Sequence, residues 1–265
     1  MPISKTDFVR ALQCQKMLWL DSHHPEEKII PPEVQARLDA GNDFGDGAMG
    51  IFGEYVETTT YREDGRLHFA AMLEKTKQLL EENTPVVCEA AFSWYGNYCA
   101  ADILKKDGNS YALYEVKNSA AVRKEFLVDL GFQRLILRKN GVPLSSSHLV
   151  LPALNEPLKI DEEGGHVRVE TVFHGDIAYK IVDVTAAAKR MERLAEKHIF
   201  EFGKLKRKDA PCPLIGVGEH CDTPYRCWYY EYCHGIVSLD GIDGCNTADI
   251  HDAVNKETND GQETP

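Results

Sequence analysis

Short apolar runs bounded by turn residues follow one another in the middle of the chain, between residues 84 and 118. Three consecutive stretches there have the composition and flanking turn residues of strands: TPVVCEAAFSWYG, NYCAADILKKDG and NSYALYEVKN. The segment KKDGNS, between the second and the third, has the residues of a hairpin turn. Two later apolar runs, SSSHLVLPAL (145–154) and YKIVDVT (179–185), predict further strands.

Apolar residues recur with a helical period on both sides of these strands. Ser4 and Asp7 have the spacing of a capping box, which predicts a helix that starts at Ser4 and continues toward Leu18. The pattern therefore predicts an α/β fold with a mixed central β-sheet flanked by helices, in a single domain over residues 1–238. Residues 239–265 are polar and have little to bury, so we expect a disordered tail. Further helices are predicted from residue 33, over 67–83, over 122–141 and from residue 186.

The composition is that of an ordinary folded protein. Of the 265 residues, 43% are apolar and 27% are charged. No apolar run approaches the roughly 20 residues that cross a bilayer, and the N-terminal segment has a helix start instead of a signal peptide. We therefore expect a cytoplasmic protein with no membrane partner. The net charge of −12 argues against indiscriminate nucleic-acid binding, although residues 186–210 contain a local basic strip.

The glycine-rich stretch over residues 40–55 is a candidate for a nucleotide-binding loop. It does not follow a predicted strand and it has no phosphate-loop lysine. A nucleotide-binding loop is therefore excluded, and we expect a helix or a bend with close backbone packing.

Glu115 and Lys117 lie on the same side of their predicted strand, because side chains alternate between the two faces. Asp102 is on the preceding strand, and a hairpin would bring it close to Glu115. Two carboxylates beside a lysine suit a hard divalent cation such as Mg²⁺ or Mn²⁺, with Glu89 as a possible third carboxylate. Such a cation activates water, while Lys117 would orient that water or neutralise developing charge.

Asp102 followed by Glu115-Val116-Lys117 resembles the catalytic signature of the PD-(D/E)XK nuclease superfamily. Gln133 falls where the RecB-like branch carries a Gln-x-x-x-Tyr motif, although Leu137 stands at the tyrosine position. The stretch GNDFGDGAMG also lacks the histidine ligand that RecB-like enzymes usually have in that place. The resemblance implies a restriction-endonuclease-like nuclease core, catalysis by Asp102, Glu115, Lys117 and Gln133, and a cation held by Glu89, Asp102, Glu115 and Val116.

Eight cysteines are many for a cytosolic chain, in which structural disulfides are not expected. Cys221, Cys227 and Cys233 are separated by two equal intervals of six, with aromatic residues between them. A four-cysteine site needs one more ligand, for which Cys14 is the candidate and Cys212 or His220 the alternatives. Zinc and an iron–sulfur cluster both suit such a set of thiolates. Cys88 and Cys99, inside strands, are expected to be buried and inert.

One N-terminal cysteine with three at the C-terminal end resembles the RecB-like nucleases that carry an iron–sulfur cluster. These include the CRISPR-associated exonucleases and the AddB nuclease domain. The two ends, SKTDFVRALQCQKMLWL and HCDTPYRCWYYEYC, are similar to an uncharacterised family related to the CRISPR enzymes, although the cysteine spacing differs from theirs. The resemblance implies a cluster, in particular [4Fe–4S], held by Cys14, Cys221, Cys227 and Cys233.

The resemblance implies a metal-dependent DNA nuclease, in particular an exonuclease that acts on single-stranded ends. Gln133 would position the scissile strand, and the segment Lys204–Lys208 would hold the DNA backbone. Trp19 and Trp228 are expected to pack against the cluster, with residues 228–232 as an alternative stacking platform for single-stranded DNA. Two alternatives remain open. One is a catalytically decayed nucleic-acid-binding module, and the other is a zinc-stabilised interaction protein in which the acidic site is a plain ion pair.

Overall fold

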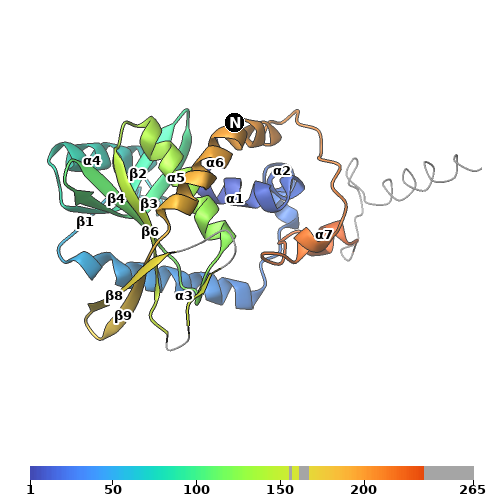
Figure 1. Cartoon of the computed structure of the whole chain (residues 1–265). Helices are drawn as coiled ribbons and strands as arrows, with labels where there is room; N and C mark the ends of the chain where they lie inside the picture. The colour runs from blue at the N-terminus through green and yellow to red at the C-terminus, as the bar shows by residue number, and fades with distance from the viewer. Residues whose placement is uncertain (155–156, 161–166, 236–265) are drawn as a thin grey trace, which may run out of the picture. The chain divides into compact units, whose positions relative to one another are not determined.

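The computed structural model describes residues 1–154, 157–160 and 167–235 (Figure 1). The chain divides into two compact units, each described separately below. The first contains Met1, Val9–Pro31 and the described residues from Phe200 onward, and we call it the cysteine unit. The second contains Pro2–Phe8 and Pro32–Ile199, and we call it the sheet unit. The predicted tail over 239–265 lies outside the described residues.

The sheet unit is built on a mixed seven-stranded sheet, which confirms the predicted α/β class. The strands follow the order β1-β2-β3-β4-β6-β9-β8, with parallel pairing of β1 with β2 and of β4 with β6 and antiparallel pairing elsewhere. A separate two-stranded sheet pairs β5 with β7. The strands are β1 (Val56–Glu57), β2 (Val86–Trp94), β3 (Asn97–Asp107), β4 (Ser110–Val116), β5 (Ala121–Val122), β6 (Leu144–Pro152), β7 (Lys159–Ile160), β8 (Arg168–His174) and β9 (Ile177–Asp183).

Helices cover both faces of this sheet (Figure 1). On one face, Ala112, Tyr114 and Val116 of β4 belong to an apolar core that also contains Ala48 and Met49, where α3 ends and η2 begins. On the opposite face, Glu115 contacts α5, a helix whose residues from 126 to 137 are all buried. The helices are α3 (Pro32–Ala48), η2 (Met49–Phe52), α4 (Phe69–Glu81), α5 (Lys124–Lys139) and α6 (Thr185–Leu205), the last of which continues into the cysteine unit.

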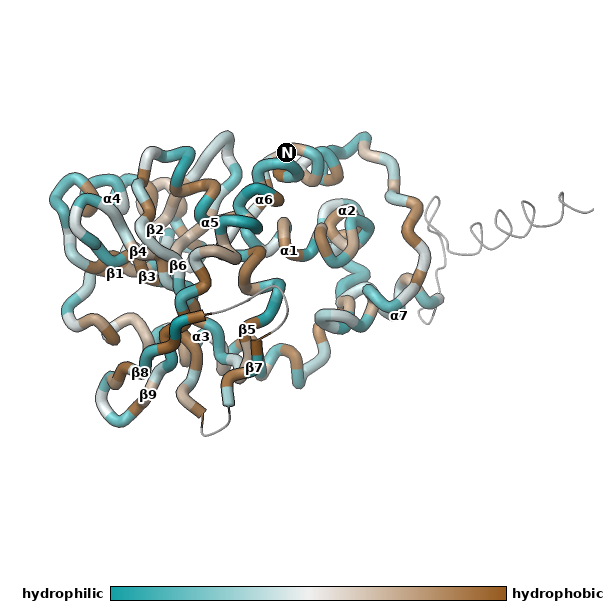
Figure 2. Tube along the Cα trace, in the orientation of Figure 1, coloured by the Kyte–Doolittle hydropathy of each residue, from teal (hydrophilic) through white to brown (hydrophobic). Residues whose placement is uncertain are grey.

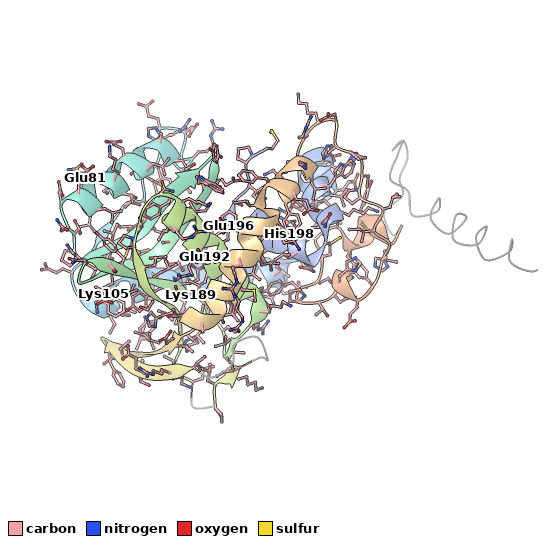
Figure 3. The ribbon with its side chains drawn as sticks, turned by 45° about the horizontal axis from the view of Figure 1, so that its top comes forward. Glu81, Lys105, Lys189, Glu192, Glu196 and His198 are labelled. Atoms are coloured by element: carbon pink, nitrogen blue, oxygen red, sulfur yellow. The ribbon has the colours of Figure 1, made fainter. Side chains whose placement is uncertain are left out.

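Helices α5 and α6 pack very closely where Gly131 faces Met191. A Cβ atom added at Gly131 would lie 2.5 Å from the backbone carbonyl carbon of Met191. Beside this contact, the buried guanidinium of Arg134 bonds Glu192 at 3.0 Å, and Arg138 also bonds Glu192. Figure 3 marks Glu192 and Glu196 on α6. The glycine and the buried ion pair together fix α6 against the helix that forms one wall of the acidic site.

The pairing of β2 with β3 is irregular at Glu89. Cys88 pairs with Ile103 and Ala90 pairs with Ala101, so Glu89 stands opposite Asp102, but it has a left-handed backbone with φ of 54°. The hydroxyl of Thr58 donates a hydrogen bond to the carbonyl oxygen of Glu89. This conformation is unusual for a residue other than glycine inside a strand, and it marks a candidate functional position.

The cysteine unit is a small cluster of short helices around aromatic residues. Its apolar core contains Met17, Trp19, Leu20, Tyr229 and Tyr232, against which four cysteines pack. The pattern of hydropathy along the trace is drawn in Figure 2. The helices are α1 (Lys5–Gln13), which begins in the sheet unit, α2 (Gln15–His23), η1 (Pro25–Glu27), η3 (Glu219–Cys221) and α7 (Tyr230–Cys233).

Most of the predicted elements are present. The capping box is confirmed, since the amide of Ser4 bonds the carboxylate of Asp7 at 3.0 Å and the amide of Asp7 bonds the hydroxyl of Ser4 at 3.1 Å. The prediction of one helix from Ser4 toward Leu18 is wrong, because Cys14 has an extended backbone and separates α1 from α2. The sequence analysis also missed β1, β5, β7 and β8.

Candidate active site and cysteine site

The sheet unit brings the predicted acidic residues together around one buried carboxylate, that of Glu115. Its side chain is fully buried. Lys117 Nζ lies 2.5 Å from Glu115 Oε1, and Gln133 Nε2 lies 2.5 Å from Glu115 Oε2. Lys5 Nζ, from the first turn of α1, lies 3.1 Å from Glu115 Oε1. Strand β4, helix α5 and the N-terminal helix therefore converge on this one side chain.

Asp102 is the second carboxylate of the site. The register of β3 and β4 places it opposite Glu115, as the hairpin predicted. The backbone amide of Val116 donates to Asp102 Oδ2 at 2.7 Å, and Lys5 Nζ lies 3.5 Å from Asp102 Oδ1. The side chain of Val116 belongs to the apolar core, so only the backbone of this residue faces the site.

Two residues of the site, Asp129 and Lys5, were missed from the sequence. Asp129 accepts hydrogen bonds from Lys117 Nζ at 2.9 Å and from Gln133 Nε2 at 2.9 Å. A signal for Asp129 existed, because it precedes Gln133 by four residues and such residues share a helix face. Lys5 had no such signal, since it is 110 residues away from Glu115 along the chain.

The charges of the site are unbalanced. Glu89, Asp102, Glu115 and Asp129 supply four carboxylates against the ammonium groups of Lys5 and Lys117, which leaves two negative charges uncompensated when all six groups are ionised. A divalent cation carries the charge that this site lacks.

The pKa values follow from this imbalance. Burial, followed by repulsion from Asp102 and Asp129, raises the pKa of Glu115 to about 8. Burial and the Asp102 carboxylate raise the pKa of Glu89 to about 7. Burial opposes the ionisation of Asp129, but the two lysines outweigh it and hold its pKa below the usual value. Burial also opposes the charge of Lys117, yet the surrounding carboxylates raise its pKa above the usual range.

Gln133 lies at the base of the site and is completely buried. Its amide nitrogen holds Glu115 and Asp129, while its amide oxygen has no hydrogen-bond partner. A buried acceptor without a partner is costly, so this oxygen marks a place for a water molecule or a cation. The side chain orients the carboxylates instead of reaching out to a nucleic-acid strand.

In this arrangement the lysines lie between the carboxylates. Among the described residues, no group of three or more His, Cys, Asp or Glu side chains has the arrangement of a single-ion site. The donor set suits Mg²⁺ or Mn²⁺ by its chemistry, and the ammonium groups of Lys5 and Lys117 lie against its oxygens.

The cysteine unit brings the four predicted cysteines to one small cavity. Cys14, Cys221, Cys227 and Cys233 all line it, with apolar neighbours that include Met17 and Leu20. His220 also lines this cavity, whereas Cys212 packs against the adjoining apolar core. The predicted ligand set is therefore assembled in one place, and His220 is the alternative ligand that lines the same cavity.

The surroundings of Cys14, Cys227 and Cys233 raise the pKa values of these three thiols and favour their neutral form. Burial raises the pKa of Cys227 to about 12, and the neighbouring cysteines add to this rise. Burial also raises the pKa of Cys14, although the backbone amides of Met17 and Lys16 oppose this rise. Burial raises the pKa of Cys233 as well. Thiolates so close together in an apolar cavity need a thiophilic cation or cluster to balance their charge.

Cys88 and Cys99, which the sequence analysis set apart from the ligand candidates, are buried in strands of the sheet unit as expected. Burial, with nearby carboxylates, raises the pKa of Cys88 to about 12. These two cysteines are therefore inert structural residues.

Three aromatic residues near the cysteines contact other side chains of the cysteine unit. Trp19 is buried and stacks on His23 at a centroid distance of 4.2 Å. Two cationic groups lie over the ring of Trp228, that of Arg10 at 4.4 Å from the ring centroid and that of Lys28 at 4.3 Å. Tyr229 is buried and donates from its hydroxyl to the carboxylate of Asp21 at 2.9 Å.

Comparisons with known proteins identify no relative: no family model, no curated protein and no solved structure matches this chain. Within the described residues, no helix combines the length and the apolar composition that crossing a membrane requires. The functional argument therefore depends on the two sites.

Proposed function

We propose that this chain is a divalent-metal-dependent deoxyribonuclease of the RecB-like PD-(D/E)XK type, which acts on DNA with single-stranded ends. One observation carries the proposal, namely the convergence of Asp102, Glu115 and Lys117 on adjacent antiparallel strands. The following buried helix α5 adds Gln133 to the same point. The crossover from β4 through α5 to the parallel strand β6 is consistent with a restriction-endonuclease-like core.

The residues of the site have separate tasks in this proposal. Asp102 and Glu115, with Glu89, would hold a Mg²⁺ or Mn²⁺ ion, whose chemistry is to polarise a phosphoryl oxygen and to lower the pKa of a bound water. Asp129 and Glu115 keep Lys117 charged and fixed, so its ammonium group can neutralise the charge that develops on the phosphate. Gln133 positions Glu115 and Asp129.

Exposed basic side chains offer contacts for the phosphate backbone. In the sheet unit, Lys189, Arg193 and Lys197 are exposed at intervals of four on α6, so they share one side of the helix; Figure 3 marks Lys189. In the cysteine unit, Lys204, Arg207 and Lys208 are exposed within the predicted backbone-binding segment. Such contacts bind without sequence preference and weaken with salt.

For the cysteine site we propose a [4Fe–4S] cluster, with zinc as the alternative. The four cysteines line one cavity with apolar neighbours, and such a set of thiolates suits zinc as well as a cluster. One N-terminal cysteine with three at the C-terminal end resembles the RecB-like nucleases that carry a cluster, and this resemblance supports the cluster.

The test is digestion of end-labelled single-stranded and duplex DNA by anaerobically purified full-length protein, with Mn²⁺, Mg²⁺ or EDTA. We expect cleavage with Mn²⁺ that requires Lys117, so Lys117→Met should lose at least about 100-fold in rate. The matched control is Lys77→Met on α4, whose side chain is exposed, which should cleave like the wild type. Absence of cleavage of every DNA form by protein that binds DNA would contradict the proposal and favour the decayed binding module.

A further inference from the structure

Lys5 is the least expected member of the acidic site. It comes from the first turn of α1, and its ammonium nitrogen lies 3.1 and 3.4 Å from the two carboxylate oxygens of Glu115. The same nitrogen is 3.5 Å from Asp102 Oδ1 and 4.0 Å from Asp129 Oδ1. One positive charge is therefore shared among three carboxylates.

The other hydrogen-bond donors of the site leave the position between Asp102 and Glu115 to Lys5. The amide of Val116 occupies Asp102 Oδ2. Lys117 and Gln133 each contact a different oxygen of Glu115. Lys5 bridges Asp102 Oδ1 and the Glu115 carboxylate, the pair of groups between which a divalent cation would bind.

The two lysines differ in how firmly they are held. Lys117 makes two short contacts, at 2.5 Å to Glu115 and 2.9 Å to Asp129. Lys5 makes longer contacts, of 3.1 to 4.0 Å, while the two side chains are about equally exposed, Lys5 at 24% and Lys117 at 25%. A lysine on a flexible four-carbon chain with a route to solvent can withdraw without unfolding the helix that carries it.

We propose that Lys5 is an internal counter-cation, which occupies the divalent-cation position between Asp102 and Glu115 and leaves it when the cation binds. The inference rests on the proposed function, because it takes these two carboxylates as the cation ligands. Cation binding is then an exchange, in which a divalent ion replaces one ammonium group. The buried Gln133 oxygen without a partner is a second group that the incoming ion or its water can satisfy. The exchange raises the cation concentration at which the site fills.

The experiment measures Mn²⁺ binding to the full-length, cluster-loaded protein by electron paramagnetic resonance of the free ion at constant pH and salt. Lys5→Met removes the charge and keeps most of the side-chain volume, so we expect it to bind Mn²⁺ at least about tenfold more tightly than the wild type. Lys5→Arg keeps the charge and should bind no more tightly than the wild type. Lys77→Met is the control for a lost surface charge, and Lys5→Gln replaces Lys5→Met if that variant fails to fold.

Two outcomes of this experiment distinguish a wrong role for Lys5 from a wrong proposed cation site. If Asp102→Asn abolishes Mn²⁺ binding but Lys5→Met and Lys5→Gln bind no more tightly than the wild type, the cation site stands and the counter-cation role of Lys5 is wrong. If the wild type and every Lys5 variant bind no Mn²⁺, or if Asp102→Asn changes nothing, the proposed cation site itself is wrong and the inference falls with it.

Discussion

The strongest quantitative prediction concerns the buried carboxyl group of Glu115, whose pKa is raised to about 8 by burial and by two neighbouring carboxylates. In the unfolded chain this group has a pKa of about 4.3. Between these two values the folded protein holds one more proton than the unfolded chain. Its contribution to stability is therefore fully present below about pH 4 and is lost as the pH rises through about 8.

The size of this effect on the free energy of unfolding follows from the difference between the folded and unfolded pKa values of Glu115. One proton of difference lowers the free energy of unfolding by up to about 1.4 kcal/mol per pH unit, so the full window sets a limit of roughly 5 kcal/mol. Water entry and side-chain rearrangement reduce the burial penalty at high pH, and we expect a loss of about 2–3 kcal/mol between pH 5.5 and pH 8.5. Glu89, with a pKa of about 7, contributes in the same direction.

The assay is urea denaturation followed by far-UV circular dichroism, under anaerobic conditions with EDTA, at four pH values in this window. Glu115→Gln should flatten the dependence of unfolding free energy on pH, while the exposed control Glu63→Gln should follow the wild type. Saturating Mn²⁺ should also flatten it, because the cation favours the ionised carboxylate. Identical pH slopes for the wild type and Glu115→Gln would show that Glu115 titrates normally and would refute the electrostatic account of the site.

Two further predictions concern the packing and the cysteine site. Gly131→Ala should lower the free energy of unfolding by about 1–3 kcal/mol or more, because the new methyl group would meet the backbone of α6 at 2.5 Å. Gly41→Ala on α3, where nothing lies within 4 Å, should instead raise it by up to about 1 kcal/mol; equal urea midpoints for both variants would contradict the close packing. Cys227→Ala should lose the iron and the broad absorption near ~400 nm of the anaerobic protein, whereas the buried Cys88→Ala should keep both. Iron retained in full by Cys227→Ala would exclude this cysteine as a ligand.

The sequence predicted the part of the site that depends on short-range structure. Asp102 and Glu115 are brought together by a hairpin, and a hairpin turn with regular strands on either side fixes the register locally. Gln133 follows on a helix whose apolar pattern and Asn-Gly stop are both visible in the chain. The stop is observed as predicted, with Gly141 in the left-handed region at φ of 76°.

The parts that were missed depend on contacts between distant residues or on weak local patterns. Lys5 reaches Glu115 across 110 residues, and a lysine at the start of a helix carries no sign of a buried partner. The break at Cys14 was hidden because apolar residues recur with a helical period on both sides of it. Strand β8 is almost wholly exposed, so its residues do not alternate between apolar and polar.

The left-handed backbone at Glu89 has a consequence for protein engineering. A residue other than glycine in this region costs of order 1 kcal/mol, so Glu89→Gly is the kind of substitution that a search for thermostable variants would select. The same substitution removes a carboxylate that faces Asp102. Screens by heat resistance alone would therefore enrich variants impaired in the acidic site, and a thermostable form of this protein should be sought with Glu89 held fixed.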